Sequence, residues 1–438
     1  MTTGVPPLVD RLFREESGRL TALLTRLLGP AQLALVEDVV QEAFIAALGH
    51  WPRQGVPDAP AAWLLQVARR KALDALRREQ AFAARLPAIA AEFDEAERLE
   101  SAGTAADAAD ASPFDDDRLR MILLCCHPAV SADSRVALTL KVVSGFGTGE
   151  IARAFLADER AVAQRLVRAK RSLREADARF EMPEGGALAA RLDAVLEVLY
   201  LMFNEGHLAH AGEALLRREL ADEARRLVER LARHAATATP AVHALAALLA
   251  FHAARFDARL DDAGRALRLA EQDRARWDAS LIARGFAHLE RAAAGDRLTP
   301  YHVEAELASL HAAAPSWEAT DWGRIVAAYD RLLALAPSPV AALNRVVAVR
   351  EASGAEAAWR ALAPLLREPA LDRYPMRHAV QAALLADRGR PDEARAAWRR
   401  ARDLTASGAL QAQVDQRLEE LAPLAPPPDV DSGTARPS

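Results

Sequence analysis

The chain has 438 residues, more than one ordinary hydrophobic core supports, so two or three domains are expected. Its net charge of −5 excludes a general affinity for polyanions, and its 5% aromatic content and few β-branched runs predict an all-α protein. Only two cysteines, no secretory signal pattern and no apolar run of about 20 residues predict a soluble, cytoplasmic protein without a membrane partner.

Residues 8–80 are expected to form a compact helical domain. A first helix over 8–28 ends at the Gly29-Pro30 break, and a second over 33–48 has an apolar stripe opposite an acidic face. Three prolines and one glycine predict a loop over 50–62, where Trp51 and Trp63 are expected to anchor the core. A third helix over 63–78 places basic residues opposite its apolar face, namely Arg70, Lys71, Arg77 and Arg78.

The stretch 81–117 is rich in alanine and acidic residues, which predicts an extended acidic linker. Helices over 118–143 should then support the next motif, with Val136, Leu140 and Val143 facing inward. The Cys125-Cys126-His127 run lacks a second Cys/His pair at ligand spacing. No metal and no cofactor are therefore predicted.

Residues 147–174 have the pattern of a helix-turn-helix, with Thr148 and Asp158 as the expected N-caps. The second helix has a buried stripe of Val162, Leu166, Ala169 and Leu173, and six basic and no acidic residues lie between Arg160 and Arg174. Such a helix enters the major groove with its first residues at the bases and later cations on phosphates. The expected base readers are Glu159, Arg160, Ala163 and Gln164, and the expected phosphate contacts are Arg165, Arg168 and Arg171.

Two of these blocks resemble a known family. Glu37-Asp38-Val-Val-Gln41-Glu42-Ala-Phe44, followed by the helix from Trp63 to Arg78, resembles conserved region 2 of a sigma-70 family initiation factor. The helix-turn-helix at 148–175 resembles region 4. The order and the short form are similar to the extracytoplasmic-function (ECF) type.

This resemblance implies residue roles. Glu37, Asp38, Gln41 and Glu42 would contact the clamp helices of RNA polymerase core, whose flap is a further expected contact. The loop at 50–62 would lie where a flipped base is captured. The promoter −10 element would face Arg69, Arg70, Lys71 and Arg77, and region 4 (118–180) would read the −35 element.

The remainder, 187–421, is predicted to be helical throughout. The run from Asp387 to Ala401 matches half of a tetratricopeptide (TPR) repeat, and Gly354 lies 35 residues before Gly389, near that repeat's period. The expected parts are a helical extension (187–312), TPR-like repeats (313–421) and a disordered tail (422–438). Several segments, among them Tyr200–His207, resemble the C-terminal extension of one subgroup of these sigma factors.

A polar set in the extension could be read as a catalytic cluster, but no nucleophile, base and orienting group follow from its spacing. These residues are expected to cap helices and form salt bridges: Asn204, Glu205, His207, Asp273, Arg276 and Asp278. No enzymatic activity is predicted.

The sequence predicts a sigma factor that directs RNA polymerase core to promoter DNA, with a C-terminal domain that regulates it through a ligand or regulatory protein. The alternative is a stand-alone helix-turn-helix regulator with a TPR-like sensor. A helical-repeat scaffold with merely solvated basic helices is a further alternative, but it leaves the paired helices at 33–48 and 63–78 unexplained.

Overall fold

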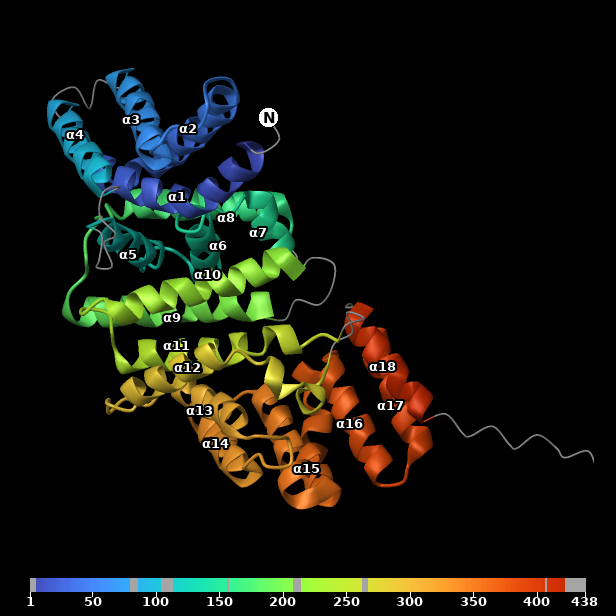
Figure 1. The fold of residues 1–438 in the computed structure, drawn as a ribbon. Coiled ribbons are helices and arrows are strands. Elements are labelled where there is room, and N and C mark those ends of the chain that lie inside the picture. Colours follow the sequence, from blue (N-terminus) through green and yellow to red (C-terminus); the bar gives the residue numbers. More distant parts are fainter. Residues whose placement is uncertain are drawn as a thin grey trace, which may run out of the picture. The chain divides into compact units, whose positions relative to one another are not determined.

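The computed structural model describes residues 5–78, 86–103, 113–155, 157–207, 214–261, 267–405 and 408–421 (Figure 1). The described part is all-α, as predicted, with helices joined by short turns and no extended β-strand. The chain divides into two compact units. Unit 1 comprises 1–209, 213–249 and 291–295, and unit 2 comprises 210–212, 250–290 and 296–438.

The first domain of unit 1 packs helices around a core rich in leucine and valine. Its elements are α1 (Val5–Leu28), η1 (Pro30–Gln32), α2 (Leu33–Gln54), α3 (Pro60–Arg78) and α4 (Leu86–Gly103). Leu23 of α1, Val36 of α2 and Leu65 of α3 are fully buried in one cluster. Each such side chain contributes roughly 1.5–3 kcal/mol by leaving water, so the apolar stripes determine how these helices pack.

The loop between α2 and α3 is shorter than the predicted 50–62. Helix α2 continues to Gln54 even though Pro52 lies within it, and α3 already begins at Pro60. Trp51 is 1% exposed and holds this last turn of α2 in the core, where its ring meets Trp63 edge-to-face. Gly55 then ends the helix with a φ of 88°, a conformation that glycine adopts without strain. Both tryptophans are core anchors, as predicted.

Part of the predicted acidic linker is a helix. Residues 86–103 form α4, in which Ile89 and Phe93 are four residues apart and buried against α3 and α1. The expectation of an extended segment was wrong there, because two apolar side chains on one face suffice to dock a helix whose other residues are mostly alanine or charged. The stretches 81–85 and 104–112 of that linker, and the tail 422–438, lie outside the described residues.

The helix-turn-helix lies on two supporting helices. The elements are α5 (Pro113–Cys125), α6 (Ala132–Val142), α7 (Thr148–Ala154) and α8 (Glu159–Glu175). The four predicted core residues of α8, namely Val162, Leu166, Ala169 and Leu173, are buried. Asp158 caps α8, as predicted, by accepting the N–H groups of Arg160 and Ala161 at 2.9 and 3.1 Å.

The predicted cap of α7 was one residue off. Gly147, not Thr148, is the N-cap residue, and the Glu150 carboxylate accepts its backbone N–H at 2.6 Å. The reason is that Glu150 reaches back one turn and satisfies the exposed donor, so a hydroxyl cap is not needed.

Unit 1 also contains the first helices of the extension. Helix α9 (Gly185–His207) packs along α10 (Ala214–Arg233), and α11 (Pro240–Ala253) begins in the same unit. Helix α9 contacts α5 and α6, and α10 contacts α5 and α7. Arg191 of α9 donates to the Leu123 carbonyl at 3.3 Å, and the half-buried Arg118 lies 3.8 Å from Glu223 of α10. The extension therefore packs directly on the helix-turn-helix domain.

Unit 2 is a succession of helical pairs (Figure 1). Its main helices are α12 (Ala279–Ala292, whose last two residues belong to unit 1), α13 (Pro300–Ala313), α14 (Trp322–Leu335), α15 (Pro339–Leu362), α16 (Pro375–Asp387), α17 (Pro391–Leu404) and α18 (Gly408–Glu420). Short 3₁₀ turns are η3 (Phe256–Ala258), η4 (Leu269–Glu271), η5 (Arg274–Arg276), η6 (Ala363–Arg367) and η7 (Pro369–Leu371).

The turn glycines follow the predicted repeat pattern. Gly354, with a φ of 82°, interrupts α15 and divides it into two helical segments. Gly389, with a φ of 70°, joins α16 to α17, where Ala394, Ala397 and Ala401 are buried at the crossing. Positive φ values and small residues at helix crossings are what a helix-turn-helix repeat of this length requires.

Candidate nucleic-acid interface

The acidic face of α2 is exposed except at one end. Asp38, Gln41 and Glu42 are exposed, whereas the Glu37 side chain is only 12% exposed. All four lie on the side of α2 opposite Val36, Val40 and Ala43, which are buried in the core. The core stripe thereby holds a row of carboxylates and one amide toward solvent.

The cations of α3 are bound to carboxylates of the same domain. Arg69 forms an ion pair with Asp94 of α4, Lys71 pairs with Glu42 of α2 at 2.6 Å, and Arg77 pairs with Asp74 at 3.0 Å. Arg70 is exposed. The Lys71–Glu42 pair brings together two residues for which the sequence predicted different partners.

Helix α8 presents its first turns to solvent. Glu159, Arg160, Gln164, Arg168 and Arg171 are exposed, and Ala163 and Arg165 are half-buried. Arg171 donates to Glu175 at 2.6 Å, four residues along the same helix. Because Val162 and Leu166 point into the core, the intervening turn of α8 exposes a surface of mixed hydrogen-bonding and cationic groups.

Charge pairs join these two domains directly. Lys170 of α8 contacts Glu37 of α2 at 2.5 Å, with 24% and 12% of their side chains exposed. The other Glu37 oxygen, Oε1, is buried and has no hydrogen-bond partner within the described parts of the chain. Sequence reasoning did not find this contact, because the two residues are 133 positions apart and each belongs to a face that suits an external partner.

The backbones also approach closely at this junction. A Cβ atom placed on Gly18 of α1 would lie 1.8 Å from the Val143 carbonyl oxygen at the end of α6. Nearby, Arg26 of α1 donates to the buried Asp117 of α5 at 2.9 Å. Burial raises the pKa of the Asp117 carboxyl, although Arg26 and Arg120 each lower it. Only a glycine allows the two helical domains to meet at this distance.

The adjacent cysteines have no chemical role that the structure supports. Cys125 and Cys126 are buried, and burial raises the pKa of Cys126 to about 12, so its thiol stays protonated at neutral pH.

Asp273 and Asp278, from the polar set of the extension, cap η5 and α12 by accepting backbone N–H groups at 2.8–3.0 Å. Within the described residues, no group of three potential metal ligands occurs.

An acidic helix beside a basic helix in one domain, and a helix-turn-helix in the next, define a two-domain DNA-binding transcription factor. Residues 12–82 match sigma-70 region 2, and residues 120–173 match sigma-70 region 4. Residues 191–293 match a family of unknown function, DUF6596. An uncharacterized protein of Rhizobium meliloti (strain 1021) is 39% identical over 391 residues, which cover 89% of this chain and 90% of the relative.

The chain therefore belongs to the sigma-70 family, as an ECF-like factor with a C-terminal extension. Members of this family are transcription initiation factors that act with RNA polymerase core at promoter DNA. Across the described residues, no helix combines the length and apolar character that crossing a bilayer requires.

Proposed function

We propose that unit 1 recognises promoters through four contacts, two with RNA polymerase core and two with DNA. The exposed face of α2 contacts the polymerase clamp helices, region 4 contacts the flap, the α3 cations hold the −10 element, and the first turns of α8 read the −35 element. The exposed row of Asp38, Gln41 and Glu42 supports this most directly, because three polar side chains opposite a fully buried stripe form a ready interface.

The extension in this proposal regulates the factor by holding region 4 against region 2. Helices α9 and α10 pack on α5, α6 and α7, while Lys170 of region 4 covers Glu37 on the proposed polymerase-binding face. In this arrangement Lys170 and the polymerase compete for contact with Glu37. Binding of the polymerase therefore requires that α8 moves away from α2.

The energies make such a switch reversible. A partly exposed ion pair contributes on the order of 1 kcal/mol, and an unpaired buried oxygen such as Glu37 Oε1 costs about as much. A stable protein interface buries roughly 1,600 Å², so polymerase contacts outweigh the Lys170–Glu37 pair once both domains are engaged. The form in which Lys170 pairs with Glu37 therefore lowers the affinity for RNA polymerase core without preventing binding.

The polymerase contact is tested by gel filtration of the full chain with RNA polymerase core. We expect the wild type to co-elute and Asp38→Arg/Glu42→Arg to elute separately, because reversed charges repel the same partner surface. Arg390→Glu/Arg399→Glu, at the exposed N-cap of α17 and at an exposed position within it, is the matched control and should co-elute. If the wild type fails to co-elute but binds duplex DNA, the stand-alone regulator is the better explanation.

The regulatory contact is tested by Lys170→Gln. Removing this cation uncovers Glu37, so affinity for polymerase core in the absence of DNA should rise about fivefold, the equivalent of roughly 1 kcal/mol. Arg171→Gln is the control, because Arg171 pairs with Glu175 inside α8 and should leave core affinity unchanged. Equal affinities for wild type and Lys170→Gln would exclude competition at Glu37.

A further inference from the structure

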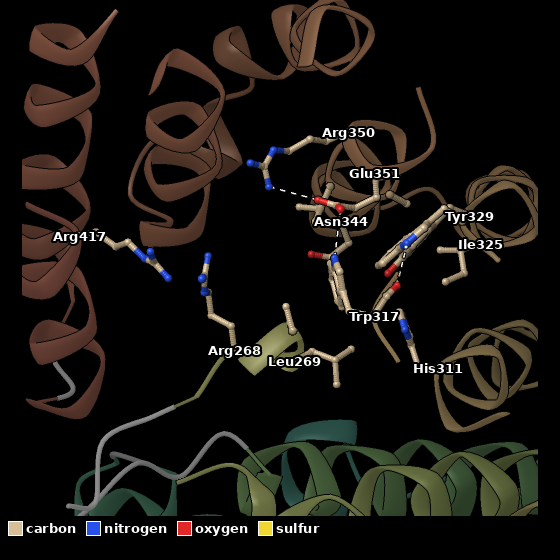
Figure 2. A pocket seen from close by; sticks show the side chains of 14 residues that line it. Arg268, Leu269, His311, Trp317, Ile325, Tyr329, Asn344, Arg350, Glu351 and Arg417 are labelled. Atoms are coloured by element: carbon tan, nitrogen blue, oxygen red, sulfur yellow. Dashed lines mark hydrogen bonds and ion pairs between the residues drawn. The ribbon is translucent and has the colours of Figure 1, made fainter. Parts of the chain in front are cut away.

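Unit 2 contains a cavity that the sigma-factor roles do not use. Its volume is about 670 Å³, and its walls come from η4, the segment from α13 through α15, and α18 (Figure 2). Sites for small organic ligands typically enclose about 300–1,000 Å³ and combine aromatic walls with a few convergent polar groups. The cavity has the volume and the combination of aromatic and polar lining that such sites require.

One wall is aromatic. Trp317 and Trp322 meet edge-to-face with ring centroids 4.4 Å apart, and the His311 ring lies parallel to Trp317 at 6.3 Å. Tyr329 and Ile325 lie on the same side of the cavity (Figure 2). Burial, together with Arg255 and Arg274, lowers the pKa of His311 to about 4, so its ring is neutral at physiological pH. This wall is therefore an uncharged surface on which a planar ring can stack.

The opposite side is cationic. Arg268 and Arg417 point toward one another across the cavity from Trp317 (Figure 2), and Arg350 lines it as well. Glu351 is the one carboxylate among the lining residues. Glu271, which is not a lining residue, accepts hydrogen bonds from both Arg268 and Arg417, and Asp387 likewise holds Arg350. Glu271 and Asp387, which lie outside the cavity, thus hold three guanidinium groups in position. Because the lining contains a single carboxylate, Glu351, the cavity wall carries a net positive charge.

We propose that this cavity binds a small aromatic carboxylate, with its ring against Trp317 and Trp322 and its acid group toward Arg268 and Arg417. A cationic ligand would be repelled by three guanidinium groups, and a purely apolar one would make no use of the N–H donors that Glu271 and Asp387 hold in position. A guanidinium fork and a carboxylate match in geometry as well as in charge. Asn344, exposed on the cavity wall, adds an amide for a second polar group.

Binding can be measured by calorimetry on the full chain, without polymerase or DNA, so its outcome is independent of the roles proposed above. The probes are biphenyl-4-carboxylate, 2-naphthoate and indole-3-acetate, with biphenyl-4-carboxamide, biphenyl-4-methylammonium and acetate as matched comparisons. We expect at least one aromatic carboxylate to bind with a micromolar to submillimolar Kd and about tenfold more tightly than its uncharged amide, because the amide loses the charge-assisted hydrogen bonds.

Two variants locate the site. Arg268→Gln, at an exposed position, should weaken the carboxylate about tenfold and leave the amide unchanged, whereas Asn344→Trp should fill the cavity and weaken both. Arg390→Gln, an exposed arginine outside the cavity, is the control and should bind like the wild type. The proposal is overturned if no aromatic carboxylate binds below about 1 mM, or if carboxylate and amide bind equally. Binding that Arg268→Gln and Asn344→Trp leave unchanged would also overturn it.

Discussion

Both units pair their cations with carboxylates, but they differ in what surrounds these pairs. In unit 1, Lys170 covers Glu37 and the cations of α3 are bound to carboxylates of their own domain. In unit 2, Arg268 and Arg417 are also held by a carboxylate, yet they line an open cavity of about 670 Å³. In unit 1 the ion pairs lie where helices pack against one another. In unit 2 the paired arginines line a cavity.

This difference indicates what each unit requires in order to act. The proposed polymerase and DNA surfaces of unit 1 become available when internal ion pairs exchange for external ones, and such an exchange is nearly neutral because exposed pairs are weak. The cavity of unit 2 needs no exchange, since its guanidinium groups are already in position.

The largest effect is expected from Gly18→Ala, which disrupts the contact between α1 and the end of α6 in unit 1. The added Cβ would overlap the Val143 carbonyl at 1.8 Å, so region 2 and region 4 must separate or unfold, at a cost above about 3 kcal/mol. Urea unfolding and the radius of gyration measured by solution scattering should both reveal the change. Gly49→Ala in α2 is the control, because its added Cβ would meet no atom within 4 Å beyond its neighbours in the chain and the backbone of its own helix, and it should stabilise by about 0.5–1 kcal/mol. Equal stability of the two variants would mean that the regions do not meet at Gly18.

Acid should weaken unit 2 through His311. Its pKa is about 4 in the folded chain, against an ordinary value of 6.5, so the unfolded chain takes up the proton first as the pH falls. The stabilisation is fully present above pH 6.5 and is lost between there and about pH 4, amounting to roughly 3 kcal/mol.

Unfolding in urea at several pH values, followed by tryptophan fluorescence, measures this loss. In His311→Gln the dependence on pH should be shallower by about that amount. It should not vanish, because burial also lowers the pKa of His252 and His378. A slope identical to that of the wild type would show that His311 is not the group that titrates.

The basic face of α8 predicts a salt-dependent effect. Arg160→Ala/Arg165→Ala/Arg168→Ala should weaken binding to duplex DNA and reduce the slope of log affinity against log salt by about one per arginine that contacts a phosphate. The control is Arg390→Ala/Arg399→Ala/Arg400→Ala at the N-cap of α17 and within it, which changes the net charge equally at exposed positions. If both triples alter the slope to the same extent, net charge rather than α8 governs binding.

The smallest effect distinguishes the two caps of the helix-turn-helix. Asp158→Ala removes an acceptor for two backbone N–H groups and should destabilise the chain by about 1 kcal/mol. Thr148→Ala should change the stability by less than about 0.5 kcal/mol, because the cap residue of α7 is Gly147 and Glu150 provides the bond. Thermal unfolding of both variants makes the comparison, and a larger loss for Thr148→Ala would contradict the observed cap.

The sequence alone determined the features that depend on a helix's own period. The four buried residues of α8, the exposed row on α2, the cap at Asp158 and the turn glycines Gly354 and Gly389 all follow from spacing within a single segment or a single repeat. A period of 3.6 residues separates a buried from a solvated face before any packing partner is known.

Which of these faces meet depends on packing between distant segments. The docking of α4 through Ile89 and Phe93, the Lys170–Glu37 pair, and a cavity built from residues as distant as Arg268 and Arg417 have no local signature. Each depends on side chains that are brought together by the packing of several helices. The sequence of one helix face does not indicate which other face it will contact. The periodicity of a segment reports which side is buried, whereas the identity of the neighbour depends on the shape and charge of the whole assembled core.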